Sequence, residues 1–179
     1  MIKFFSDKLV SLIILILISP ILILIAFVNF LVDGFPITYS SIRVGYKNNK
    51  FTIYKFRSMK NNSSEILGKW GSFIRRTNLD ELLQFINVIK GDMSIIGPRP
   101  HDELEDIYFE KNIKDYYLRK VVKPGITGLS AIKGNRGGTD LNNIRERVKY
   151  DLEYIENQSF VLDCIIFFKT IFLFFKPNH

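Results

Sequence analysis

The sequence predicts an α/β monotopic membrane protein, in which a re-entrant N-terminal helix and interfacial amphipathic helices accompany a small cytosolic α/β domain. Three observations lead to this prediction: an uncharged N-terminal run, two central segments of alternating β-favouring residues, and an apolar segment near the C-terminus. We place the three regions at residues 1–34, 35–159 and 160–179.

The composition narrows the classes of partner. The net charge of +7 favours an anion, such as nucleic acid, a phosphorylated metabolite or anionic lipid. The basic residues are scattered singly and are not interleaved with stacking aromatics, which argues against nucleic acid. The single cysteine, Cys164, can form no internal disulfide, and two histidines far apart in the sequence make a zinc site improbable.

Residues 9–32 carry no charge and are long enough to cross a bilayer as one helix. Ser19 and Pro20 lie near the centre, where proline removes a backbone donor and bends a helix. We therefore expect a bent helix that returns to the side it entered from, with a kinked span as the alternative. Lys3 and Lys8 favour a cytoplasmic start, which the re-entrant path satisfies.

Residues 37–44 and 51–57 predict a β-hairpin. Lys55 and Arg57 share one face of its second strand, where they form either a solvated edge or part of an anion site. An apolar element follows at residues 66–74, with Trp70 suited to an interface.

The segment from Arg75 to Pro100 combines several chemical features. Asn78 and Glu81 predict a capping box, with a helix that begins at Leu79 and ends at Gly91. Asp80 would then lie in the first turn, where free N–H groups favour carboxylates and phosphates. The buried face of this helix would consist of apolar residues at helical spacing: Leu79, Leu82, Leu83, Ile86 and Ile89.

Basic residues flank this helix on both sides. Arg75 and Arg76 precede it, and a short strand at residues 93–96 leads to Arg99 between Pro98 and Pro100. The two prolines stiffen the backbone that presents the guanidinium, which suits bidentate phosphate binding. Taken alone, the acidic pair is more often a helix cap and the arginine loop an ordinary turn.

The C-terminal half predicts further helices and loops. Residues 101–120 suggest one or two amphipathic helices with a solvated acidic face. Residues 123–128 and 134–138 are expected to be loops, which would place Lys133 and Arg136 near the basic residues Arg119, Lys120 and Lys123. Residues 141–157 predict a helix, and residues 160–175 an in-plane membrane helix, with a core helix as the alternative.

Taken together, the motifs resemble the bacterial sugar transferase family, in particular the small monotopic phosphoglycosyl transferases. The resemblance follows family order across nearly the whole chain. It rests on Ser19-Pro20, residues 55–59, 75–82, 87–94, 97–100, 123–128 and 150–155. Three positions depart from the family pattern: Leu83 stands where proline is common, Ala131 where glutamine is usual, and residues 133–136 only approximate a Gly-Arg pattern.

The resemblance implies transfer of a sugar phosphate from a UDP-sugar to polyprenyl (undecaprenyl) phosphate, with release of UMP. Asp80 would form a phosphosugar-aspartyl intermediate, and Glu81 would help to hold Mg²⁺ or handle a proton. Both carboxylates, Asp80 and Glu81, are the implied Mg²⁺ ligands. Ser19-Pro20 would set the bend of the membrane helix. The implied substrate-binding residues are Lys55, Arg57, Arg75, Arg76, Pro98, Arg99, Pro100 and Arg136.

The resemblance also implies a setting. The enzyme would be a minimal catalytic form at the cytoplasmic face of the bacterial inner membrane, in contact with membrane lipids and with downstream glycosyltransferases as possible partners. Two alternatives stay open: a membrane-bound phosphohydrolase, and a non-catalytic member of a glycan assembly complex. The identity of the sugar and the oligomeric state are not encoded in these motifs.

Overall fold

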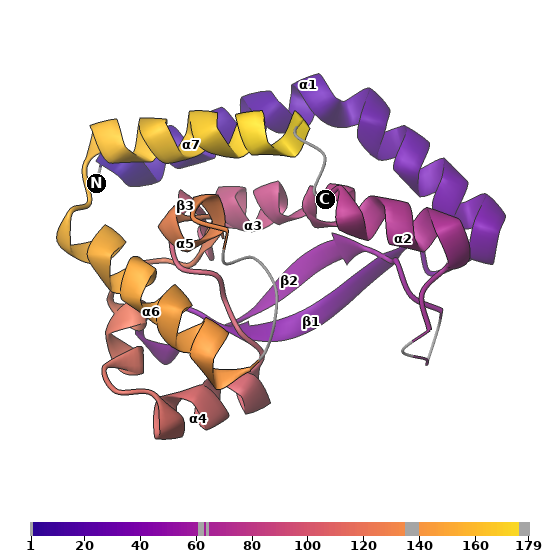
Figure 1. The fold of residues 1–179 in the computed structure, drawn as a ribbon. Coiled ribbons are helices and arrows are strands. Elements are labelled where there is room, and N and C mark those ends of the chain that lie inside the picture. Colours follow the sequence, from indigo (N-terminus) through magenta and orange to yellow (C-terminus); the bar gives the residue numbers. More distant parts are fainter. Residues whose placement is uncertain (1, 61–62, 64, 135–139, 176–179) are drawn as a thin grey trace.

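The structure is a computed structural model that describes residues 2–60, 63, 65–134 and 140–175. Helices and strands are interspersed along the chain, in agreement with the predicted α/β class. The apolar helices α1 (Ile2–Asp33) and α7 (Phe160–Phe175) form one layer, and α2 (Gly68–Arg76) and α3 (Gln84–Lys90) lie beneath them (Figure 1). The hairpin of strands β1 (Thr38–Val44) and β2 (Lys50–Phe56) lies below those helices. Helices α4 (Glu103–Asn112) and α6 (Leu141–Glu156) lie at the end of the molecule away from α2.

Helix α1 spans Ile2–Asp33 and contains Pro20. Its direction changes about half-way along in Figure 1. Beside the proline, the Ser19 hydroxyl donates to the carbonyl of Ile16 at 2.8 Å, so the serine satisfies a backbone acceptor near the interruption. Within the described part of the chain, α1 is the one helix long and apolar enough to cross a membrane.

Polar contacts attach both ends of α1 to the α/β part of the molecule. Near its start, the Ser94 hydroxyl donates to Asp7 at 2.5 Å. Near its end, Asn29 is fully buried, accepts from the Trp70 indole at 2.6 Å and donates to the carbonyl of Arg57 at 2.9 Å. An amide buried in an apolar helix needs such partners, so these bonds fix where α1 rests.

The predicted hairpin is confirmed. Strands β1 (Thr38–Val44) and β2 (Lys50–Phe56) pair antiparallel across the turn η1 (Tyr46–Asn48). Helix α2 (Gly68–Arg76) follows and carries Trp70 toward α1.

The predicted capping box and helix start are wrong. Leu79–Glu81 is a 3₁₀ turn, η2, and helix α3 begins only at Gln84 and runs to Lys90. Asn78 is left-handed, with φ of 53°, and its side chain makes no cap bond, because an N-cap requires extended backbone. Gly91 does end the helix, in the left-handed conformation that glycine favours.

The predicted buried face of this helix is only partly right, because its apolar residues Leu79, Leu82, Leu83 and Ile89 are half-buried. The residues of α3 that are buried are Gln84, Asn87 and Val88, whereas Ile86 is exposed. The Asn87 amide explains the difference, since it donates to the carbonyl of Thr52 at 2.6 Å and accepts from the amide of Tyr54 at 3.2 Å. Its side chain thus binds the edge of β2 as a neighbouring strand would, and turns this face of α3 toward the hairpin.

Part of the segment expected to be a loop at residues 123–128 is a strand. β3 (Ser94–Ile96) pairs in parallel with β4 (Gly125–Thr127). The two backbone segments approach closely here, and a Cβ on Gly97 would collide with the carbonyl oxygen of Lys123. Glycine therefore permits this crossing, which leads into the short helix α5 (Leu129–Ile132).

The segment 101–120 forms helix α4 (Glu103–Asn112) and the 3₁₀ turn η3 (Tyr116–Val121). Its acidic cluster is not wholly solvated as predicted. Asp106 is buried and accepts from Lys120 at 2.6 Å and from the Tyr116 hydroxyl at 3.0 Å. A charge buried in this way requires a partner, which η3 supplies.

The last two helices are α6 (Leu141–Glu156) and α7 (Phe160–Phe175). Helix α7 buries Ile166 in the main core, while its other side is exposed and apolar. It overlies the first half of α1 in Figure 1, and Lys3 of α1 donates to Asp163 of α7 at 2.5 Å. The exposed apolar residues of α7 are Phe160, Val161, Ile165, Phe168, Ile171 and Phe172.

Candidate active site

The candidate site is built around an ion-pair cluster on Glu81. The Lys55 ammonium donates to Oε1 at 2.6 Å, and the Arg99 guanidinium binds both carboxylate oxygens, at 2.6 and 3.0 Å. Strand β2, turn η2 and the loop after β3 each supply one of these groups. The structure thus brings together three predicted site residues from distant parts of the chain.

The surroundings of Glu81 keep it ionised. Burial opposes ionisation, but the charges and hydrogen bonds of Arg99 and Lys55 outweigh it and lower the pKa of Glu81 well below its usual range. The same carboxylate raises the pKa of Arg99. Arg99 nevertheless leaves 42% of its side chain exposed, so the ion pair lies close to the protein surface.

Asp80 lies beside this cluster in a different state. It is 8% exposed, and in the part of the chain that the structure describes its carboxylate forms no salt bridge. Burial and the neighbouring Glu81 raise the pKa of Asp80 to about 6, although Lys55 and Arg75 act in the opposite direction. At neutral pH Asp80 is therefore mostly ionised and more basic than an ordinary aspartate, which suits a nucleophile.

The loop that carries Arg99 is held by backbone hydrogen bonds to β4. The Gly97 amide donates to the carbonyl of Thr127 at 2.9 Å, and the Gly125 amide donates to that of Pro98 at 2.9 Å. Pro98 and Pro100 restrict the remaining backbone freedom. The guanidinium is therefore presented to Glu81 from a rigid support.

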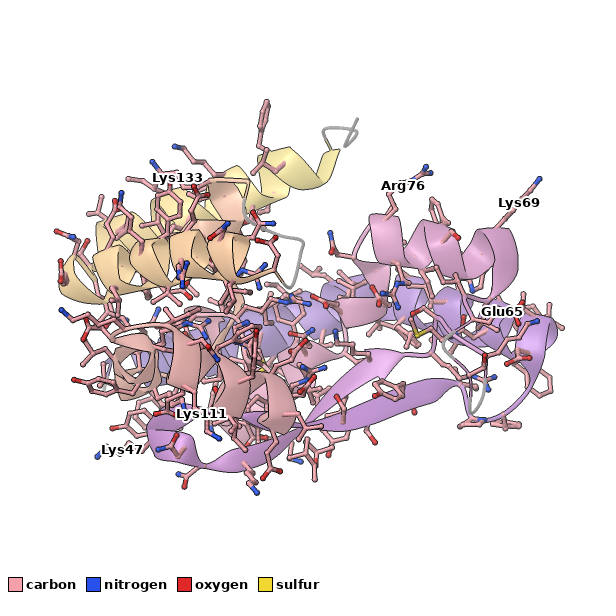
Figure 2. All side chains as sticks on the ribbon, turned by 60° about the horizontal axis from the view of Figure 1, so that its bottom comes forward. Lys47, Glu65, Lys69, Arg76, Lys111 and Lys133 are labelled. Carbon is pink, nitrogen blue, oxygen red and sulfur yellow. The ribbon has the colours of Figure 1, made fainter. Side chains whose placement is uncertain are left out.

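The two arginines before the turn η2 differ from each other. Both are exposed in the last turn of α2, and Arg75 lies close enough to lower the pKa of Asp80. Arg76 points outward from α2 (Figure 2). Arg75 is thus the member of the pair that acts on the candidate nucleophile.

Two other predicted binding residues have different surroundings. The Arg57 guanidinium is buried at the end of α1, where it donates to the carbonyls of Asp33 and Gly34 at 2.9 and 3.0 Å. The structure therefore places Arg57 at the junction with α1 and not on Glu81. Arg136 lies outside the described residues, and Lys133, at the end of α5, lies over the ring of Tyr150.

Comparison with known proteins decides the family. A family model described as bacterial sugar transferase matches residues 1–177. The chain belongs to the bacterial sugar transferase family. The resemblance inferred from the motifs is therefore confirmed.

Several relatives in this family carry names that state an activity. A Klebsiella pneumoniae protein, "UDP-glucose:undecaprenyl-phosphate glucose-1-phosphate transferase", is 42% identical over 95% of this chain and 39% of its own length. An Aeromonas hydrophila protein, "UDP-N-acetylgalactosamine-undecaprenyl-phosphate N-acetylgalactosaminephosphotransferase", is 38% identical over 92% of this chain and 41% of its own length. The chain thus spans about two fifths of these two relatives.

A third relative has a length similar to that of this chain. The "Exopolysaccharide production protein PSS" of Rhizobium leguminosarum bv. phaseoli is 34% identical over 88% of this chain and 86% of its own length. The family match and the exposed apolar helix α1 together indicate a membrane-associated protein.

The predicted Mg²⁺ ligands of this family member, Asp80 and Glu81, differ in availability. Both oxygens of Glu81 are engaged by cations, and the described residues contain no cluster of three or more metal-binding side chains. Mg²⁺ commonly binds one or two carboxylates together with substrate phosphates and water. Asp80 fits such a site as its single protein carboxylate, and Glu81 in its present contacts does not.

Sequence reasoning missed the buried polar network behind the site. Arg119 donates to Asp151 at 2.7 Å and to the carbonyl of Arg99 at 2.8 Å, and lies against His101. Burial and the surrounding arginines, Arg119 foremost, lower the pKa of His101 far enough to keep the ring neutral. The positions of Arg119 and Asp151 in the sequence, 32 residues apart, carried no signal that they meet.

Proposed function

We propose that this chain transfers a sugar phosphate from a UDP-sugar to undecaprenyl phosphate and releases UMP. Two neighbouring carboxylates carry the proposal. Asp80 is buried and has no salt bridge among the described residues, whereas the negative charge of Glu81 is balanced by Lys55 and Arg99. The names of the family relatives support the same donor and acceptor classes.

The proposed reaction has two displacements. First, an Asp80 carboxylate oxygen attacks the β-phosphorus of the donor, the bond from that phosphorus to the bridging oxygen breaks, and UMP leaves. Second, an oxygen of the lipid phosphate attacks the same phosphorus and displaces Asp80. The product is a lipid diphosphosugar, and the carboxylate is regenerated.

Charge around Asp80 supports this role. Arg99 lies near the surface beside Asp80 and would contribute positive charge toward the phosphates of the donor, while Arg75 adds positive charge nearby. Glu81 holds Arg99 and Lys55 in fixed positions, so the cations need no rearrangement as the donor binds. We expect Mg²⁺ to be required, with Asp80 as its protein ligand, because the ion would offset charge on the diphosphate.

The experiment uses the full chain purified in detergent, incubated with Mg²⁺ and a panel of UDP-sugars with and without undecaprenyl phosphate. We expect UMP release that depends on the lipid beyond one turnover, and a sugar phosphate adduct on Asp80 when donor alone is supplied. Continuous UMP and sugar phosphate release without lipid would identify a hydrolase. The absence of UMP release with every donor would favour a non-catalytic role.

We further propose that α1 is re-entrant and that the α/β domain lies on the cytoplasmic face. Contacts at both ends support this, since Asp7 binds Ser94 and Asn29 binds Trp70 of the same domain. A helix that spanned the bilayer would separate these ends by the hydrocarbon thickness, about 30 Å.

Cysteine labelling tests the path of the helix. In a Cys164→Ser background, Ser6→Cys and Tyr39→Cys should both resist a membrane-impermeant maleimide in intact spheroplasts and react after permeabilisation, as the surface control Lys111→Cys does. Labelling of one position from outside would establish a span instead.

A further inference from the structure

Arg119 lies at the centre of the contacts that hold the Arg99 loop from behind. Its side chain is 5% exposed, and its three nitrogens face three different groups. Nε donates to Asp151 at 2.7 Å, one terminal nitrogen donates to the carbonyl of Arg99 at 2.8 Å, and the other lies 3.1 Å from His101 Nδ1. The guanidinium also lies over the ring of Tyr116, with its carbon 5.0 Å from the ring centroid.

Asp151 in turn fixes Arg119. It lies on α6, is 1% exposed, and accepts from the Ser130 hydroxyl of α5 at 3.1 Å through its second oxygen. Contacts from η3, α5 and α6 therefore converge on the peptide that carries Arg99. A carbonyl bonded to a buried, ion-paired guanidinium has little freedom to move.

The neighbouring ion pair provides a contrast. Lys120 is buried to a similar extent and donates to Asp106 at 2.6 Å and to Glu110 at 2.9 Å. Both of its acceptors lie on α4. The adjacent residues Arg119 and Lys120 thus offer two buried ion pairs, of which one reaches the loop of the site and the other joins η3 to α4.

From these contacts we infer that Arg119 is a positioning residue: it fixes the Arg99 carbonyl, and thereby the Arg99–Glu81 ion pair beside Asp80. The inference rests on the proposed function and extends it to a residue that touches neither substrate nor the reacting carboxylate. Asp151 contributes to this positioning because it holds the Arg119 guanidinium in the orientation that reaches the Arg99 carbonyl.

Arg119→Lys is the first test, since lysine keeps the charge but cannot bond Asp151 and the Arg99 carbonyl through a planar fork. We expect kcat for UMP release to fall about 10- to 100-fold, with a smaller change in KM for the donor, because small displacements of a site group cost this much. Lys120→Gln is the matched control and should keep kcat per folded molecule close to that of the wild type. Equal losses in the two variants would overturn the inference.

A double-mutant cycle separates positioning from general destabilisation. In an Arg99→Ala background, Arg119→Lys should cost little more, because the side chain that it positions is gone. In a Lys55→Ala background, Arg119→Lys should reduce kcat by the same factor as in the wild type. Lys55 binds Glu81 from β2, so its contact does not depend on the Arg99 loop that Arg119 holds. Multiplicative losses in both backgrounds would overturn the inference. Asp151→Asn provides a second variant with the same expected pattern if Arg119→Lys fails to fold.

Hydrogen exchange provides a readout that needs no activity. Arg119→Lys should speed exchange in a peptide covering residues 97–101, whereas Lys120→Gln should speed it in α4. A wild-type protein that releases no UMP, with this exchange pattern present, would reject the proposed function and retain the structural coupling. Unchanged exchange at residues 97–101 would reject the positioning role.

Discussion

Asp80 and Glu81 are neighbours in the chain, yet their surroundings are opposite. Two cations bind the Glu81 carboxylate and lower its pKa, whereas burial and the charge of Glu81 raise that of Asp80 to about 6. The difference arises because the 3₁₀ turn directs the Glu81 carboxylate toward β2 and the Arg99 loop and leaves that of Asp80 beside them, with no salt bridge to any residue that the structure describes. Adjacent acids can therefore divide two roles, one fixing cations and the other reacting.

The largest expected effect comes from removing the reactive carboxylate. Asp80→Asn should reduce UMP release by about 10³-fold or more and abolish the adduct with donor alone, because an amide is a poor nucleophile. The control Asp115→Asn changes an aspartate whose side chain makes no cap bond and should retain activity. Normal turnover in Asp80→Asn would show that Asp80 is not the nucleophile and that the two acids do not divide the roles as proposed.

Glu81→Gln should have the next largest effect. It leaves Lys55 and Arg99 without their shared anion, so we expect kcat to fall about 10²-fold through loss of positioned charge. It should also lower the pKa of Asp80, since Glu81 raises it. The surface variant Glu65→Gln, which loses only an exposed pair with Lys60, serves as the control.

The pH dependence of adduct formation tests the raised pKa directly. At donor and Mg²⁺ concentrations too low to saturate the protein, where the rate reports the metal-free form, it should be constant above pH 7 and fall through a midpoint near pH 6, where Asp80 becomes protonated. At pH 5 the loss should be about tenfold. A midpoint near 4 in single-turnover measurements would mean that Asp80 titrates like an ordinary aspartate.

Stability provides a smaller and independent comparison. Because the pKa of Asp80 is raised, the folded state holds this proton more tightly than the unfolded state does. The free energy of unfolding therefore falls as the pH rises from 3.8, the ordinary pKa, through about 6, the pKa in the folded state. Asp80→Asn should therefore increase the free energy of unfolding by about 1–3 kcal/mol at pH 8. The gain should vanish near pH 3, where aspartate is protonated in both states, as denaturant unfolding at both pH values can check.

The smallest effect separates the two exposed arginines. Arg75 lowers the pKa of Asp80, so Arg75→Gln should move the midpoint of adduct formation upward by about 0.3 pH unit, a size typical of an exposed charge. Arg76→Gln should leave the midpoint in place, because its side chain points away from α2 into solvent. A shift of equal size in both variants would indicate a general effect of net charge.

Local patterns in the sequence predicted the hairpin, α6 and the apolar helices, because alternation and uncharged runs reflect burial of neighbouring residues. They failed at η2, where Asn78 and Glu81 match a capping box but Glu81 binds Lys55 and Arg99 instead. A strong charged contact from a distant segment outweighs a local cap.

The candidate site was predicted from motifs, and its geometry was not. Motif order identified Asp80, Glu81, Lys55 and Arg99, but no periodicity links Arg119 to Asp151 or Arg57 to the end of α1. Such contacts join residues that are far apart in the chain, and they form only when several elements are packed. Sequence patterns therefore identified the proposed reacting groups, but they did not identify the residues that hold those groups in place.

The anchors of α1 have a consequence for the order in which the molecule is completed. The ribosome makes this helix before the segments that it contacts: Asp163, the partner of Lys3, is added 160 positions later, and Ser94 and Trp70, the partners of Asp7 and Asn29, also follow the helix. During synthesis these polar groups must stay hydrated or find temporary partners. Nascent chains that stop short of α7 should therefore be easier to extract from the membrane and easier to proteolyse than the finished protein.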